Sequence, residues 1–221
     1  MAKGKRAARV EARQAANRRR SVIQTAIAAA AVLGIGAGWW FTRPPAAPPV
    51  VPERLALEHS QGPEDAQVTI VEYGDYNCPS CQRYHQLGII DRVLDAYPGQ
   101  VRFVFRHFPI ITADSPRLAE AAECAADQDA FWRFHNVLYA EAPTRPGDMT
   151  VFAERLGLDV EAFTACLEGR WYADLIEAQM RDAFGFGFRG TPSFRVNGQA
   201  LAGPPGYDQL VAMIEGLLET P

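Results

Sequence analysis

VTIVEYGDYNCPSC, residues 68–81, is the stretch of sequence that decides the fold. In it an apolar run, 68–71, precedes Cys78-Pro79-Ser80-Cys81, and a predicted helix follows to about Ala96. The first turn of a helix offers unpaired backbone N–H groups and the positive end of the helix dipole, and both favour a thiolate over a thiol. We therefore predict that Cys78, with its sulfur directed to solvent, is a nucleophile. Cys81 lies one turn further, is more covered and is the expected resolving thiol, with Pro79 and Ser80 as the active-site dipeptide between them.

A zinc site and a purely structural disulfide are the alternative interpretations of this cysteine pair. A structural zinc ion needs four ligands, usually from a second close pair, whereas Cys124 and Cys166 are isolated and no histidine has finger-like spacing. The position between a strand and a helix argues against a structural bridge. We expect a redox pair that uses no metal and no cofactor, with His85, His107 and His135 at surface or packed positions.

Glu72 lies six residues before Cys78, inside the predicted strand. It shares one face of that strand with Val68 and Ile70, because alternate residues of a strand point the same way. A carboxyl group on a covered face has a raised pKa and can shuttle protons to the resolving thiol. The alternative is a glutamate that faces water at an edge. We predict the proton-relay role.

The rest of the domain alternates strands and helices. Its order is strand–helix–strand, a block of helices, then strand–strand–helix, which predicts an α/β fold with a four-stranded sheet and a helical insertion. The expected strands are 67–73, 101–108, 191–196 and 199–201.

Thr191-Pro192 starts the third of these strands. An X-Pro bond tolerates the cis form, which would leave the backbone groups of Thr191 free to pair with an extended peptide. A trans proline that opens an edge strand is the alternative, and the spacing does not choose between the two.

The N-terminal part of the chain predicts a membrane anchor. Residues 1–21 are basic, and 22–42 form an apolar segment that would span about 30 Å as a helix, which matches a hydrocarbon core. The positive-inside rule then places the tail in the cytoplasm and the remainder on the extracytoplasmic side, periplasmic or cell-surface. A cleaved signal peptide is the alternative, but the apolar segment ends in Gly-Trp-Trp-Phe rather than in a small-residue cleavage site. Residues 43–54 are proline-rich and predict an extended spacer before the domain at 55–221.

The charge of the domain excludes nucleic acid as a partner. Residues 44–221 carry 13 arginines, no lysine and 25 acidic residues. A domain this acidic has no cationic stripe with which to displace the counterions of a phosphate backbone.

Several motifs together resemble the DsbA-like branch of the thioredoxin superfamily, and the resemblance covers about residues 55–220. In chain order the motifs are Glu72, Cys78-Pro79-x-Cys81, Phe105-Arg106-His107-Phe108-Pro109, Phe131-Trp132, Thr191-Pro192-Ser193-Phe194 and Val196-Asn197-Gly198.

This resemblance implies a thioredoxin fold with a helical domain inserted at about 112–186. It also implies a cis Pro192 beside the cysteine pair, a buried Glu72, and thiol–disulfide exchange with unfolded or reduced exported proteins. One position departs from the pattern, since Ser80 stands where the strongly oxidising founding member of the family has histidine. The loss of that imidazole removes one stabiliser of the Cys78 thiolate.

Cys124 and Cys166 form a second pair within the expected insertion. Outside the cytoplasm an even number of cysteines favours a structural disulfide between them. Two buried free thiols that act as small apolar residues are the alternative.

The resulting hypothesis is a membrane-tethered oxidase that introduces disulfides into exported proteins. It requires a membrane quinone-linked oxidase, DsbB-like or vitamin-K-epoxide-reductase-like, to re-oxidise the pair. A disulfide isomerase or reductase with the same fold is one alternative, and a non-catalytic binding or chaperone module is another.

Overall fold

The computed structural model of the chain describes residues 58–141, 148–201 and 203–219. The predicted basic tail (1–21), membrane anchor (22–42) and proline-rich linker (43–54) lie outside these residues. Among the helices that are described, none is both long and apolar enough to cross a bilayer.

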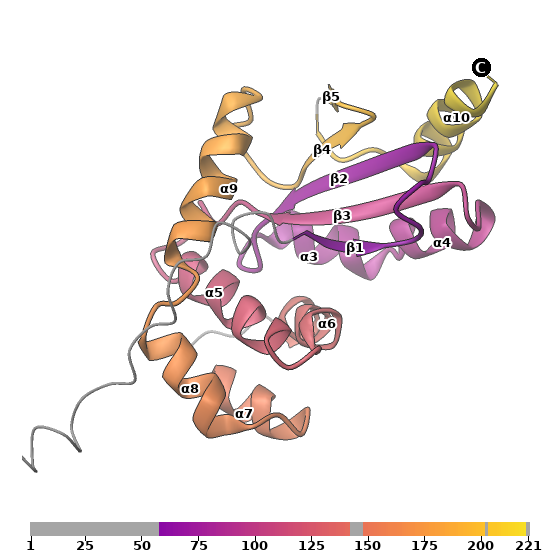
Figure 1. The fold of residues 1–221 in the computed structure, drawn as a ribbon. Helices are drawn as coiled ribbons and strands as arrows, with labels where there is room; N and C mark the ends of the chain where they lie inside the picture. Colours follow the sequence, from indigo (N-terminus) through magenta and orange to yellow (C-terminus); the bar gives the residue numbers. More distant parts are fainter. Residues whose placement is uncertain (1–57, 142–147, 202, 220–221) are drawn as a thin grey trace, which may run out of the picture. The chain divides into compact units, whose positions relative to one another are not determined.

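A five-stranded mixed sheet forms the centre of the described domain (Figure 1). Its strands are β1 (His59–Gln61), β2 (Val68–Gly74), β3 (Val101–His107), β4 (Ser193–Val196) and β5 (Gln199–Leu201). They lie in the order β1-β3-β2-β4-β5, with β2 and β3 parallel and the other pairs antiparallel. The prediction of four strands was wrong by one, because β1 is an edge strand of three residues and is too short to show an alternating pattern.

The helices are divided between the sheet and a separate helical group. Helices α3 (Pro79–Gln86) and α4 (Ile89–Ala96) connect β2 to β3, and α10 (Tyr207–Leu218) follows β5. We expected one continuous helix from the cysteine motif to about Ala96, but Gly88 divides it by adopting a left-handed conformation with φ of 59°. A left-handed residue interrupts helical hydrogen bonding, and glycine adopts it without a steric penalty.

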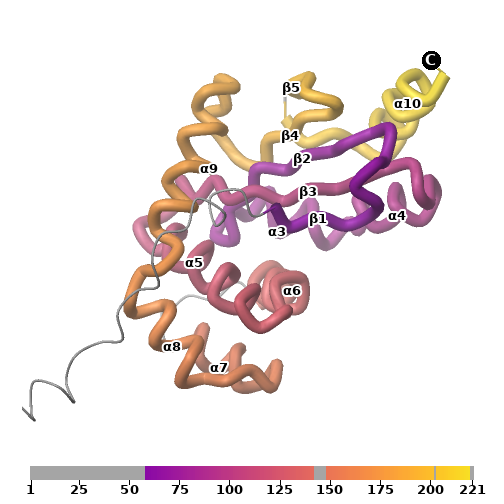
Figure 2. Tube along the Cα trace, in the orientation of Figure 1, coloured from indigo at the N-terminus to yellow at the C-terminus, as the bar shows by residue number. Residues whose placement is uncertain are grey.

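In the described residues between β3 and β4 there are five helices. After β3 the chain leaves the sheet, runs through this group and returns at β4, as the tube in Figure 2 shows. The helices are α5 (Ser115–Ala126), α6 (Phe131–Glu141), α7 (Asp148–Arg155), α8 (Val160–Glu168) and α9 (Ala173–Gly185). A disulfide joins Cys124 of α5 to Cys166 of α8, with a Cα–Cα distance of 5.8 Å, so the structure has the bridge rather than two free thiols.

The central strand β2 sends its two faces into two different clusters. Val68 and Ile70 enter the large core that contains Cys81 and the inward residues of α3 to α8 and α10, whereas Tyr73 packs with Phe108 in a smaller cluster. At the end of β2, Gly74 leaves no room for a side chain, because a Cβ there would lie 2.5 Å from the Tyr139 hydroxyl. The main chain therefore approaches α6 closely just before the cysteine loop.

Candidate functional site

Cys78 is the residue that caps the N-terminus of α3. Its backbone is extended, with φ of −82° and ψ of 117°, and Pro79 takes the first helical position, where its missing N–H is not needed. The Cys78 N–H donates to the carbonyl oxygen of Asp75 at 3.0 Å. The buried Asp75 carboxylate in turn accepts from the backbone N–H groups of Asn77 and Ile111, each at 2.8 Å. The loop that carries the first cysteine is therefore fixed from both sides.

Thr191 covers this cysteine. The Cys78 sulfur lies 3.2 Å from the Thr191 carbonyl oxygen, to which the thiol donates, and the Thr191–Pro192 peptide bond is cis. The expectation that the Cys78 sulfur is directed to solvent is therefore corrected, since this residue is only 4% exposed and Cys81 is completely buried. The cover comes from a loop more than a hundred residues away in sequence.

The two thiols have opposite electrostatic environments. The pKa of Cys78 is lowered from 9.0 to about 5, first by the hydrogen bond that the Cys81 thiol donates to it. Burial opposes this change, while the Thr191 side chain and the backbone N–H groups of Cys81 and Ser80 lower the pKa further. The pKa of Cys81 is raised well above 9.0, mainly by burial and then by the hydrogen bond to Cys78 and the charge of Glu72. At neutral pH the pair is thus a thiolate at Cys78 and a thiol at Cys81.

Glu72 lies at the middle of the sheet, behind the cysteine pair. It is paired in register with Phe105 of β3 on one side and with Phe194 of β4 on the other. The residue is 6% exposed, so the water-facing alternative does not hold. Burial, and secondarily the charge of Cys78, raises the pKa of its carboxyl group to about 8. Glu72 is therefore mostly protonated at neutral pH and has a proton to give.

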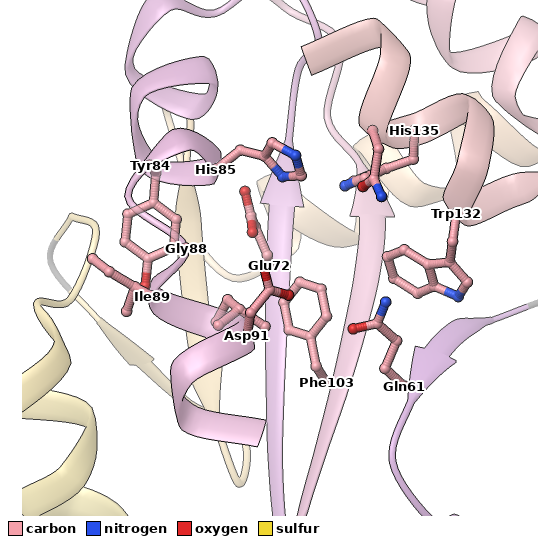
Figure 3. A pocket seen from close by; sticks show the side chains of 12 residues that line it. Gln61, Glu72, Tyr84, His85, Gly88, Ile89, Asp91, Phe103, Trp132 and His135 are labelled. Atoms are coloured by element: carbon pink, nitrogen blue, oxygen red, sulfur yellow. The ribbon is translucent and has the colours of Figure 1, made fainter. Parts of the chain in front are cut away.

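A small pocket opens beside Glu72. It has a volume of about 40 Å³. Figure 3 shows the Glu72 carboxyl pointing toward the His85 ring of α3, with His135 and Trp132 of α6 across the pocket. The residues that line it are Gln61, Glu72, Tyr84, His85, Gly88, Ile89, Ile90, Asp91, Phe103, Trp132, His135 and Asn136.

All four histidines of the chain gather beside this site, which the sequence did not predict. His59 and His107 each place Nε2 at 2.8 Å from the buried carboxylate of Glu123 in α5. The His135 ring lies 5.5 Å from that of His85 and 4.5 Å from that of Phe105. No spacing in the sequence signals the cluster, because four different elements contribute to it. Among the described residues, no group of three or more His, Cys, Asp or Glu side chains is arranged to hold a metal ion.

Comparison with known proteins gives a family and a set of similar structures. The thioredoxin family model matches residues 56–216. A thioredoxin-like oxidoreductase from Silicibacter pomeroyi DSS-3 is 30% identical with a TM-score of 0.67, and the match covers 74% of this chain and 94% of that one. BdbD from Bacillus subtilis is 26% identical with a TM-score of 0.67, over 73% and 93% of the two chains. α-DsbA1 from Wolbachia pipientis, at 19% identity and a TM-score of 0.65 over 72% and 90%, has the same fold.

The curated relatives are much longer proteins. A protein named Na(+)/H(+) antiporter NhaA 3, from Salinispora tropica, is 38% identical over 169 residues, which are 75% of this chain and 25% of that protein. A protein named Na(+)/H(+) antiporter NhaA, from Herminiimonas arsenicoxydans, is 34% identical over 76% of this chain and 26% of its own length. This chain therefore spans about a quarter of the length of the curated relatives it matches.

Proposed function

This chain belongs to the thioredoxin family and is DsbA-like, and from that premise we propose that it introduces disulfides into exported proteins through Cys78 and Cys81. The family and the similar structures support thiol–disulfide exchange in general. The direction of the exchange, the place where it happens and the partners are the proposal.

The observation that carries the proposal is the asymmetry between the two sulfurs. A pKa of about 5 at Cys78 means that the reduced enzyme is stabilised as a thiolate at neutral pH. Whatever stabilises the reduced form makes the disulfide form a stronger oxidant. The pair is therefore suited to accept electrons from the thiols of a substrate. Ser80 supplies no imidazole here, but the Cys81 thiol and the backbone N–H groups still lower the pKa of Cys78.

The exchange proceeds in two steps. A substrate thiolate attacks the Cys78 sulfur of the oxidised pair, the Cys78–Cys81 bond breaks, and the Cys81 sulfur leaves with the bonding electrons. Because the pKa of Cys81 is raised, this sulfur takes a proton, for which Glu72 is the nearby acid. A second substrate thiolate then attacks the substrate sulfur of the mixed disulfide and releases Cys78 as a thiolate. The substrate is oxidised by two electrons and the enzyme is reduced by two.

Thr191 and Pro192 form the site for the substrate main chain in this proposal. The Thr191 carbonyl oxygen lies next to the Cys78 sulfur, and the cis bond to Pro192 precedes the start of β4. An extended peptide that carries the attacking cysteine can pair with the backbone of Thr191 and so bring its sulfur to Cys78.

The N-terminal sequence supports the proposed location, and that location in turn suggests the electron acceptor. The apolar segment 22–42 and its basic flank support a single-pass anchor with the domain outside the cytoplasm. An oxidase there has to be re-oxidised, and we propose a quinone-linked membrane enzyme of the DsbB-like or vitamin-K-epoxide-reductase-like kind. The anchor would keep the domain close to it.

The reduction potential tests the direction of electron flow. The oxidised protein is equilibrated with glutathione buffers, and a reduced, unfolded protein with two cysteines is offered as substrate. An oxidase is expected to have a potential well above that of thioredoxin, toward about −120 mV rather than about −270 mV. A value near the lower figure would favour the reductase alternative. The Cys78→Ser variant should form no substrate disulfide, and disulfide formation at the wild-type rate in that variant would overturn the assignment of Cys78 as the reacting thiol.

A further inference from the structure

The pocket beside Glu72 is lined by that buried residue and by the partly exposed His85, one turn after Cys81. We propose that it is the proton route of this site and that His85 is the relay group at its mouth. This inference rests on the proposed thiol–disulfide exchange and assigns a role to a residue that the exchange itself does not require.

The carboxyl group of Glu72 needs such a route. It is 94% buried, and within residues 58–141, 148–201 and 203–219 it makes no hydrogen bond. Each time Cys81 is released or re-oxidised, this group has to lose a proton and regain one. The pocket it faces has a volume of about 40 Å³, whereas a water molecule needs roughly 10–15 Å³ of such space. A short chain of water molecules therefore fits between Glu72 and the surface.

His85 is placed to pass protons through this pocket. It lies in α3 one turn after Cys81, lines the pocket, is partly exposed, and makes no hydrogen bond within the described part of the chain. Its ring is held by ring contacts to His135 at 5.5 Å and Tyr139 at 5.1 Å. An imidazole can accept a proton on one nitrogen and release one from the other. His135 is less suited, because it is 3% exposed and its Nδ1 is engaged by the Tyr76 hydroxyl at 3.0 Å.

The other groups around the pocket are compatible with a neutral His85. Burial lowers the pKa of this histidine, and the charge of Asp91 opposes that change. Asp91 is exposed and lies at the solvent side of the pocket. The titratable groups that face Glu72 or the pocket come from four places: the loop before α3, α3 itself, α4 and α6. They are Tyr76, Cys78, Cys81, Tyr84, His85, Asp91, His135 and Tyr139.

The proton balance of the step is as follows. When a substrate thiolate attacks Cys78, the Cys78–Cys81 bond breaks and the Cys81 sulfur takes the bonding pair together with the proton of the Glu72 carboxyl. His85 then takes a proton from solvent on one ring nitrogen and releases one from the other through the pocket waters to the Glu72 carboxylate, so that the ring is neutral again at the end. Re-oxidation of the pair runs the same transfers in reverse.

Single-turnover kinetics of the full chain test the relay. Oxidised protein is mixed rapidly with a dithiol peptide in dilute buffer over a range of pH. The His85→Ala variant is expected to release Cys81 about 10-fold more slowly, less than the ~10²–10⁴-fold of a direct acid–base group because water still carries some protons. Added imidazole should restore the rate, since the deletion leaves space for it. His85→Gln, which fills the space but takes up no proton, should be slow and less responsive to imidazole. Arg83→Ala, on the exposed side of the same helix, is the matched control and should keep the wild-type rate.

Two results would overturn the inference. One is a His85→Ala variant as fast as the wild type at every pH. The other is a slow variant that imidazole does not restore and whose pH profile keeps its shape, since that pattern indicates only a packing role. An unchanged pKa of Cys78 in the variant shows that the site has folded. The proposed function is judged separately by Cys78→Ser, so a functional enzyme with a dispensable His85 defeats this inference alone.

Discussion

At the scale of single residues, the sequence predicts which sulfur reacts but not all of its surroundings. Cys78 is identified by its place before a helix, and the strand alternation puts Glu72 on the covered face. The contact between Cys78 and Thr191 joins residues 113 positions apart, and no local pattern encodes it. That contact is why the sulfur is buried where we expected solvent. The position of a loop relative to a distant helix depends on tertiary packing.

The ionisation of Cys78 gives the first prediction. The ultraviolet absorbance of its thiolate should titrate in the reduced protein with a midpoint near pH 5, because the Cys81 thiol and backbone N–H groups stabilise the anion. Replacing Cys81 by Ala removes the largest of these contributions, so the pKa of Cys78 should rise. A midpoint near the ordinary value of 9.0 in the unmodified protein would contradict the assigned site.

The stability of the reduced protein depends on pH through Glu72 and through Cys78, and the two dependences have opposite signs. The pKa of Glu72 is raised from 4.5 to about 8, so between these values the folded state holds a proton that the unfolded state has lost, and stability falls as pH rises. The pKa of Cys78 is lowered from 9.0 to about 5, so the folded state has lost a proton that the unfolded state retains, and stability rises with pH. Over the shared range the two effects should largely cancel.

The second prediction concerns Glu72→Gln, which removes the Glu72 effect on stability and leaves the Cys78 effect. As the pH rises from 5 to 8, the free energy of unfolding of the reduced variant should increase, because only the Cys78 effect remains. The increase is at most about 1.4 kcal/mol per pH unit, which is the limit for one proton. Urea unfolding in reductant at closely spaced pH values measures this slope. Cys78→Ser is the matched control and should lose stability over the same range, because burial alone still raises the pKa of Glu72. Slopes of the same sign in the two variants would disprove the opposite pH dependences assigned to Glu72 and Cys78.

At the scale of secondary structure, long and regular elements are predictable and short ones are not. The strands at β2 and β3 have clear apolar patterns, and Asp159 caps α8 as its side chain predicts, accepting from the Ala162 N–H at 3.0 Å. The edge strand β1 has only three residues, and its place depends on partners far along the chain. His59 in β1 reaches Glu123 of α5 and stacks on Phe131 with ring centroids 3.4 Å apart. These contacts between elements hold β1 in place, and its own sequence does not specify them.

The bridge between α5 and α8 gives the third prediction. Cys124 and Cys166 are 42 residues apart, and in the chain-entropy model a closed loop of that size stabilises the fold by about 3–4 kcal/mol. Cys124→Ala/Cys166→Ala should lower the free energy of unfolding by that amount, measured by urea unfolding in a Cys78→Ser/Cys81→Ser background. Reductant should destabilise the parent to a similar level and leave the quadruple variant unchanged. Equal stability with and without the bridge would refute its structural role.

At the scale of the whole molecule, the site is assembled from segments that the sequence keeps apart. The four histidines at positions 59, 85, 107 and 135 come from β1, α3, β3 and α6, and the other three lie around the buried His135. From the sequence we placed three of them separately at surface or packed positions. Spacing predicts the reacting cysteines, whereas the pocket and the relay proposed in it depend on the packing of the helical group against the sheet.

The orientation of the full chain is the last prediction. If 22–42 spans the membrane as its length and flanks indicate, a probe in the tail and a probe in the domain should lie on opposite sides. Both are introduced as single cysteines, Ala7→Cys and Glu64→Cys, in a Cys78→Ser/Cys81→Ser background, because Glu64 is exposed whereas Cys78 is buried. A membrane-impermeant maleimide should label the domain probe in intact cells, after permeabilisation of any outer membrane or cell wall. The tail probe should react only after detergent is added. Labelling of both probes from outside would contradict the predicted orientation, and a soluble product that lacks the tail would replace the anchor with a cleaved leader. Both results would leave the redox chemistry of the domain as argued.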